Sequence, residues 1–169
     1  HRETVEVLLD LGAAINNKNE DEKTPFLLAA ENGHDDVVKF LLNKFEKEKH
    51  LLNDTDEDDN SALHLAASQN LTRTVDVLLK FKADFRRKNM KGWTPLDCAA
   101  ANGSYNCILR MLEAGAEVDA IDKGEYGKET ALHLTAIKGH ANVTKLLLER
   151  GAKVTLKNKD EKNALELAI

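Results

Sequence analysis

The stretch TPLDCAAANGSYNCILRMLEAGA, residues 94–116, gathers side chains that catalysis could use. It contains both cysteines of the chain, Cys98 and Cys107, together with Asp97 and Ser104. A thiol or hydroxyl activated by a neighbouring base is the usual starting point for nucleophilic catalysis. Such chemistry requires the side chains to share one surface, so the elements that carry them must be identified first.

Two histidines, His64 and His133, form a second candidate group. A pair of imidazoles can bind a metal ion or act as a general base. Both stand at the fourth position of a short recurring motif, where other copies of the motif have Asp97 and Glu166. Because a required metal ligand would not be replaced in this way, the pattern weakens the metal interpretation.

The motif recurs along the whole chain. It reads TPFLLAA at 24–30, SALHLAA at 61–67, TPLDCAA at 94–100, TALHLTA at 130–136 and NALELAI at 163–169. Its successive copies are therefore 37, 33, 36 and 33 residues apart. A period of this size indicates a repeat architecture in which each unit buries its apolar face against its neighbours.

Each unit predicts two short helices. The Thr or Ser that opens most copies of the motif suits a helix N-cap, and Pro25 and Pro95 suit the first helical position. Apolar pairs at helical spacing, such as Val37-Val38 and Leu41-Leu42, predict the second helix. Residues that tolerate a left-handed backbone should end the first helix. These residues are Gly33, Asn70, Gly103 and Gly139.

The pattern resembles the ankyrin repeat over essentially the whole chain. The resemblance implies an all-α fold, an ankyrin-repeat solenoid of stacked helix-turn-helix units with projecting hairpins. The predicted division is a partial repeat at 1–23, repeats at 24–60, 61–93, 94–129 and 130–162, and the start of a further repeat at 163–169. Neither end carries a polar capping unit, so we expect the sequence to be a fragment of a longer array.

Two units are longer than the others. In the first, we expect the second helix to continue through 44–49 before the segment 50–53 (HLLN) rejoins the repeat. In the second, the stretch IDKGEYGKET lengthens one hairpin. The glycine expected at the hairpin turn is kept only as Gly92. The other hairpins have Glu22, Asp59, Lys128 and Glu161 there.

These irregularities make the chain similar to one group of ankyrin-repeat proteins in particular. The uneven spacing, the 50–53 insertion, the hairpin 91–94 (KGWT) and the turn 103–105 (GSY) are similar to the last ankyrin repeats of transient receptor potential channels of the ankyrin subfamily. The resemblance implies a cytoplasmic segment of a tetrameric cation channel. The electrophile-sensing cysteines of that family lie downstream of the repeats, so it assigns no sensor role to Cys98 or Cys107.

The repeat positions reinterpret the reactive side chains. The resemblance implies that His64 and His133 hydrogen-bond to neighbouring backbone, and that His34 and His140 do the same after the turn. Cys98 takes a position that is leucine in other copies, which predicts a small buried side chain. The alignment leaves the burial of Cys107 open.

Charge is segregated between two consecutive hairpins. The segment 54–59 carries five acidic residues, and the segment 80–91 carries six basic ones against Asp84 alone. One interpretation is that the two hairpins pair with each other as a solvated, mutually screening surface, in which exposed ion pairs contribute only about 0.2–1 kcal/mol each. The alternative is that the second hairpin binds an acidic partner, an anionic lipid or an inositol phosphate. The candidate residues for such binding are Arg86, Arg87, Lys88 and Lys91.

Two aromatic residues complete the set of candidate partner-binding residues. Trp93 is the only tryptophan, and tryptophan is favoured where proteins bind each other. Tyr126 stands near the tip of the lengthened hairpin. The alternative is that Trp93 packs on an adjacent hairpin or first helix.

The sequence predicts no catalytic residue, no cofactor and no metal site, because it contains no phosphate-binding glycine loop, nucleophile elbow or Cys/His metal spacing. A net charge of −5 argues against nucleic-acid binding, and no apolar run is long enough to cross a bilayer. These absences favour a non-catalytic scaffold. The resemblance implies that it lies on the cytoplasmic side of the plasma membrane, binds proteins that include neighbouring channel subunits, and couples them to the gate of a ligand- or temperature-gated cation channel. The alternatives are a soluble cytoplasmic adaptor or inhibitor, and a regulatory domain of an enzyme such as a kinase.

Overall fold

The computed structural model describes residues 1–45, 50–121 and 128–169. Within these residues the chain forms α helices and one 3-10 helix, joined by turns and loops without a strand. The elements are α1 (Arg2–Asp10), α2 (Pro25–Glu31), α3 (Asp35–Lys44), η1 (Leu51–Asn53), α4 (Ala62–Ser68), α5 (Thr72–Lys80), α6 (Pro95–Ala101), α7 (Tyr105–Glu113), α8 (Ala131–Lys138), α9 (Ala141–Glu149) and α10 (Ala164–Leu167).

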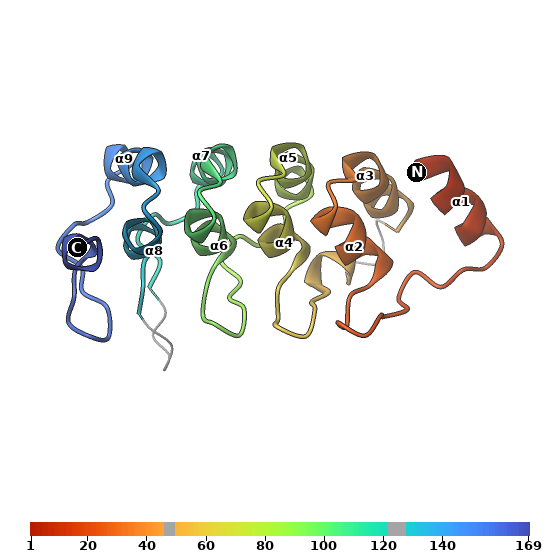
Figure 1. Cartoon of the computed structure of the whole chain (residues 1–169). Helices are drawn as coiled ribbons and strands as arrows, with labels where there is room; N and C mark the ends of the chain where they lie inside the picture. The colour runs from red at the N-terminus through yellow and green to blue at the C-terminus, as the bar shows by residue number, and fades with distance from the viewer. Residues whose placement is uncertain (46–49, 122–127) are drawn as a thin grey trace.

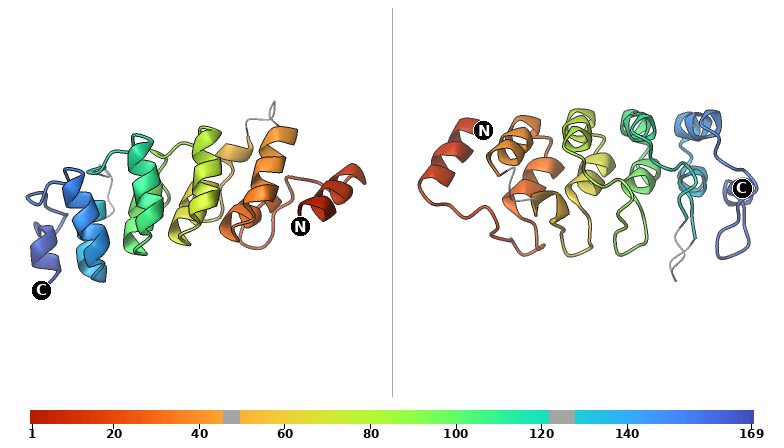
Figure 2. Two further views of the ribbon diagram at one scale, coloured as in Figure 1. Left: turned by 90° about the horizontal axis from the view of Figure 1, so that it is seen from above. Right: turned by 180° about the vertical axis from the view of Figure 1, so that it is seen from behind.

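The helices lie in two layers (Figure 1). The even-numbered helices contact one another in chain order, and so do the odd-numbered helices behind them. The loops between units project from the edge of the even-numbered layer, and the two termini lie at opposite ends of the stack (Figures 1 and 2). This arrangement confirms the predicted all-α solenoid.

The first helix of each pair begins at its predicted cap. The caps are Thr24, Ser61, Thr94, Thr130 and Asn163. In the last four, the residue at the fourth motif position bonds back to the cap's backbone N–H, which completes a capping box. The fourth motif position therefore has a structural role before any chemistry is considered.

The turn after the first helix is left-handed in every complete unit. The values of φ are +72° at Gly33, +57° at Asn70, +68° at Gly103 and +73° at Gly139, as predicted. At Gly103 the turn is also crowded, because an added Cβ would lie 2.9 Å from Nδ1 of His140 in the next unit. Glycine is therefore needed there for both conformation and space.

The hairpin turns keep a left-handed residue even where glycine is missing. Glu22, Asp59, Lys128 and Glu161 have φ between +51° and +60°, and Gly92 has +75°. A non-glycine residue in this conformation costs about 1–2 kcal/mol. The stack thus imposes the repeat conformation on side chains that disfavour it.

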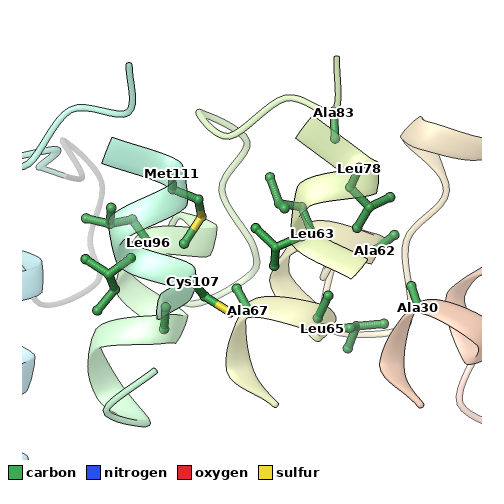
Figure 3. Packing of buried hydrophobic residues seen from close by; sticks show 14 of the residues in the cluster. Ala30, Ala62, Leu63, Leu65, Ala67, Leu78, Ala83, Leu96, Cys107 and Met111 are labelled. Atoms are coloured by element: carbon green, nitrogen blue, oxygen red, sulfur yellow. The ribbon is translucent and has the colours of Figure 1, made fainter. Parts of the chain in front are cut away.

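Small and aliphatic side chains fill the space between units (Figure 3). Ala30, Ala66, Ala67 and Ala100 are fully buried, which lets the first helices approach closely. Leu78 and Met111 are fully buried on the second helices. The core runs along the stack from one unit to the next, as expected when each unit can bury its apolar face only against its neighbours.

The second helix of the 24–60 unit was predicted to continue through residues 44–49, and this prediction is wrong at Phe45. Helix α3 ends at Lys44, and Phe45 has already left helical geometry, with φ −110° and ψ 31°. Phe45 packs against the core instead of continuing the helix. Residues 46–49 lie outside the described residues, and the chain then forms the 3-10 helix with Leu51 buried.

Candidate functional site

His64 is held inside the stack by hydrogen bonds on both ring nitrogens. Nδ1 lies 3.2 Å from the backbone nitrogen of Ser61 and 2.8 Å from its Oγ, and Nε2 lies 3.0 Å from the carbonyl oxygen of Trp93. Because the Ser61 N–H must donate, Nδ1 accepts, and the ring proton sits on Nε2 and is donated to Trp93. Burial lowers the pKa of His64 to about 4, so the ring is neutral near pH 7.

His133, two repeat units further along the chain, has the same hydrogen-bond geometry. Its Nδ1 accepts from the backbone nitrogen of Thr130 at 3.1 Å, and its Nε2 lies 3.0 Å from the carbonyl oxygen of Leu156. Each histidine therefore ties its own helix start to the following hairpin. The implied backbone role of both histidines is confirmed, and neither ring nitrogen is free to bind a metal ion.

His140 also bonds to backbone, as the resemblance implies. Its Nε2 lies 3.1 Å from the carbonyl oxygen of Ala101 in the preceding unit. The ring of His34 instead contacts the ring of His1, with centroids 4.5 Å apart. Both residues occupy structural positions at the turn between helices.

Asp97 occupies the position that is histidine in other copies, but only one of its two carboxylate oxygens is hydrogen-bonded within the described part of the chain. Its Oδ2 accepts from the backbone nitrogen and the hydroxyl of Thr94, at 2.9 and 2.7 Å. Its Oδ1 is buried and has no hydrogen-bond partner among the described residues. Burial raises the pKa of Asp97 to about 6, although the hydrogen bonds from Thr94 oppose the change.

Both cysteines are buried side chains. The Cys98 sulfur accepts from Nδ2 of Asn89 at 3.8 Å, and burial raises the pKa of its thiol to about 12. The side chain of Cys107 is fully buried between units (Figure 3), with its sulfur 3.8 Å from Oδ1 of Asn70 and its pKa raised by burial. Neither thiol has the lowered pKa and exposure that a reactive cysteine needs.

The described residues contain neither a cluster of metal ligands nor a membrane-spanning helix. Among residues 1–45, 50–121 and 128–169, no group of three or more His, Cys, Asp or Glu side chains could hold a metal ion. In the same part of the chain, every helix is too short or too polar to cross a membrane.

The hairpins form a hydrogen-bonded row that the sequence reasoning missed. Each described hairpin contains an Asn or Asp whose Oδ1 accepts from the backbone nitrogens two and four residues later. These residues are Asn19, Asp56, Asn89 and Asn158. Their position, five residues before each motif start, was visible in the sequence and could have identified them.

Neighbouring hairpins in this row are also bonded to each other. The backbone nitrogen of Glu57 donates to the carbonyl oxygen of Asp21 at 3.2 Å, and that of Met90 donates to Asp58 at 2.9 Å. Nδ2 of Asn89 donates to Oδ1 of Asn60 at 2.8 Å. Backbone and amide groups therefore join the acidic hairpin (54–59) to the basic hairpin (80–91) by hydrogen bonds.

The predicted basic cluster is spread over several places. The Arg86 guanidinium lies 5.5 Å from the ring centre of Phe85, and Arg87 donates to the carbonyl oxygen of Asn53 at 3.3 Å. Lys88 donates to the carbonyl oxygen of Ile121 at 3.0 Å. Arg86 and Lys88 border one groove of about 230 Å³, whereas Lys91 borders another.

The second groove, which we call the Trp93 groove, has a volume of about 170 Å³. It lies between two hairpins and the helices α4 and α6. Its lining includes Asp58, Asn60, Leu65, Ser68, Trp93 and Asn102. Trp93 is partly buried and packs against the core, and the Lys91 ammonium lies 5.3 Å from the centre of its ring. Both interpretations of Trp93 are therefore compatible with its position.

Tyr126, the remaining candidate, lies outside the described residues, as does most of the lengthened hairpin. The surface around Trp93 includes residues that were not singled out from sequence. Met90 is 54% exposed at the hairpin tip beside Lys91, and the amide of Asn102 borders the groove. The only sequence signal for Met90 was its place next to the Lys-Gly-Trp turn, and Asn102 had none.

Comparison with protein families gives two matches, and together they cover nearly all of the chain. The family described as ankyrin repeats (3 copies) matches residues 1–54 and 45–122, and ankyrin repeats (many copies) matches residues 111–168. The chain belongs to the ankyrin-repeat family. Ankyrin repeats are non-catalytic protein-interaction modules, so this chain is an ankyrin-repeat interaction scaffold.

Similar curated proteins include two channels. The chain is 32% identical over 166 residues to a transient receptor potential cation channel subfamily A member 1 homolog of Caenorhabditis elegans, covering 98% of this chain and 13% of that protein. It is 27% identical over 186 residues to the human subfamily A member 1 channel, covering 90% of this chain and 17% of the channel. Canine inversin is 33% identical over 69% of this ankyrin-repeat chain and 11% of its own length. The chain thus spans less than a fifth of each of these relatives.

Proposed function

We propose that this ankyrin-repeat chain belongs to the cytoplasmic N-terminal repeat region of a cation channel in the plasma membrane. There it would couple protein partners or neighbouring subunits of a tetramer to the gate. The observation that supports this most is the alignment with the nematode channel, which covers 98% of the chain. It therefore runs through both lengthened units, whereas the match to canine inversin covers 69%.

The repeat divisions at 1–23, 24–60, 61–93, 94–129, 130–162 and 163–169 remain part of this proposal. So does a partner surface that includes Arg86, Arg87, Lys88, Lys91, Trp93 and Tyr126. An anionic lipid or inositol phosphate is a weaker candidate ligand, because Arg87 and Lys88 are already engaged with backbone carbonyls. A protein partner at the hairpin edge agrees better with this arrangement.

The channel role is tested on the full-length protein. The complete coding sequence should contain a set of apolar helical spans after residue 169, and cells expressing it should show cation currents. Replacing residues 24–162 with a designed ankyrin array of the same number of repeats should keep the stack but change gating. A coding sequence without such spans, or one with a kinase signature, would instead support an adaptor or a regulatory domain.

A further inference from the structure

The hairpin tips differ in chemistry along the row. The tips at 20–22 and 57–59 are entirely acidic, whereas the next tip is Met90-Lys91-Gly92, followed by Trp93. All six acidic residues are exposed. Of these, Glu20, Asp21, Glu57 and Asp58 form no ion pair with any described residue. An unneutralised acidic edge thus leads directly to the Trp93 groove.

The groove itself suits one apolar side chain and the backbone beside it. Leu65 and the partly buried indole of Trp93 supply apolar surface, and Asn102 and Ser68 supply polar groups at the border. The lateral bonds from Glu57 to Asp21 and from Met90 to Asp58 fix the tips relative to the groove. The site is therefore organised before a ligand arrives, which reduces the entropic cost of binding.

The spacing of the stack limits the conformation of a ligand that follows it. Packed helices lie about 8–10 Å apart, so successive tips advance by about the same distance. A polyproline II segment has three residues per turn and rises about 3.1 Å per residue, or about 9 Å per turn. Every third side chain of such a segment therefore meets successive units on the same face. A β-strand would turn alternate members of that series away.

We propose that the acidic tips and the Trp93 groove bind a polyproline II segment of a partner protein with the pattern cation-x-x-cation-x-x-apolar. Its two cations lie over the tips at 57–59 and 20–22, and its apolar side chain enters the groove against Trp93. The Lys91 ammonium, 5.3 Å from the indole centre, disfavours a cation at the groove position. This inference rests on the interaction role proposed above but not on the channel role.

The binding test uses fluorescein-labelled peptides and fluorescence anisotropy at low salt with the intact chain. The probe is Lys-Pro-Pro-Lys-Pro-Pro-Leu-Pro-Pro, measured in both sequence directions because the orientation is not specified by the tips. One direction should bind saturably. Replacing both Lys by Glu, or Leu by Gly, should weaken binding at least tenfold, which corresponds to about 1.4 kcal/mol. Moving the cations to a two-residue spacing should weaken it similarly.

Variants of the chain locate the site. Glu57→Gln with Asp58→Asn should weaken binding about tenfold, whereas the matched pair Asp160→Asn with Glu161→Gln on the last hairpin should change it less than twofold. Ser68→Leu, which fills the groove without changing charge, should abolish binding while the unfolding midpoint shows that the stack is intact. Equal effects of the two charge pairs, tighter binding of the Glu peptide, or no saturable binding would overturn the proposal. Cation currents from the full-length protein would stand independently of either result.

Discussion

The fourth motif position is occupied by histidine in the 61–67 copy and by aspartate in the 94–100 copy. Both side chains bond to the cap of their own helix, but only the histidine also bonds to the next hairpin. His64 bonds its own cap through Nδ1 and the next hairpin through Nε2. Asp97 bonds its cap through Oδ2 but leaves Oδ1 buried without a partner among the described residues. A residue that looks catalytic can thus be a structural tie, by which we mean a buried side chain whose hydrogen bonds join a helix start to neighbouring backbone. The tie is complete in His64, where all polar side-chain atoms are bonded, and incomplete in Asp97.

The largest expected effect comes from removing a complete tie. His64→Ala leaves the Ser61 N–H and the Trp93 carbonyl oxygen without their partner, and should lower the free energy of unfolding by about 2–4 kcal/mol. Urea unfolding measures the change. The exposed Gln69→Ala, at the end of the same helix, should change it by about 0.5 kcal/mol or less. Similar values for both variants would show that the tie is not stabilising.

The contact between turns gives the next largest effect. Gly103→Ala must adopt φ near +68° and also displace the ring of His140, so it should cost about 2–3 kcal/mol. Gly139→Ala has φ near +73° but no neighbour within 4 Å, so only the backbone cost of about 1–2 kcal/mol applies. Thermal unfolding of both variants measures the difference. An equal loss would mean that the contact with His140 adds nothing.

Neutralising the incomplete tie should stabilise the stack. Asp97→Asn keeps an oxygen for the Thr94 donors and removes a buried charge, so it should raise the free energy of unfolding by about 1–2 kcal/mol at pH 7.5. The native pKa of about 6 lies above the unfolded value near 3.8, so the native state binds more protons between these pH values. The penalty in the original chain therefore develops as pH rises through this range, and the gain from the variant should vanish by about pH 4. A gain that is independent of pH would contradict this explanation.

The hairpin turns give the smallest effect. Glu161→Gly relieves a left-handed residue with φ +58° and should stabilise the chain by about 0.5–1 kcal/mol. Gly92→Ala places a non-glycine residue at φ +75° in the corresponding turn and should destabilise the chain by about 1 kcal/mol, the lower end of the left-handed cost. Unfolding midpoints of the pair check the sign. A loss of stability in Glu161→Gly would show that its exposed side chain contributes more than the strain costs.

The sequence was sufficient to predict the parts of the fold that depend on local chemistry. Helix caps, left-handed turns and the burial of Cys98 followed from residue type and repeat position. The end of α3 was mispredicted because Phe45 packs on the core, and this tertiary contact leaves no periodic signal. The burial of Cys107 likewise depends on the neighbouring unit and could not be read from the alignment.

The candidate surface was predicted less completely than the fold. The sequence singled out Trp93 and Lys91, which do border one groove. It grouped Arg86, Arg87 and Lys88 with them because they are close in sequence, but Arg86 and Lys88 border the other groove and Arg87 bonds to the carbonyl oxygen of Asn53. The Asn or Asp that organises each described hairpin was missed because it lies five residues before the motif and not within it.

Titration of His64 and Asp97 by NMR in the intact chain tests most directly whether the reactive-looking residues are structural ties. We expect His64 to keep its proton on Nε2 and stay neutral down to about pH 4, and the carboxyl of Asp97 to titrate near pH 6. The two groups then have opposite effects on stability. The His64 contribution is lost as pH falls from about 6.5 towards 4, whereas acidification over nearly the same range removes the Asp97 penalty. A histidine that titrates near 6.5, or an aspartate that titrates near or below 3.8, would contradict the account.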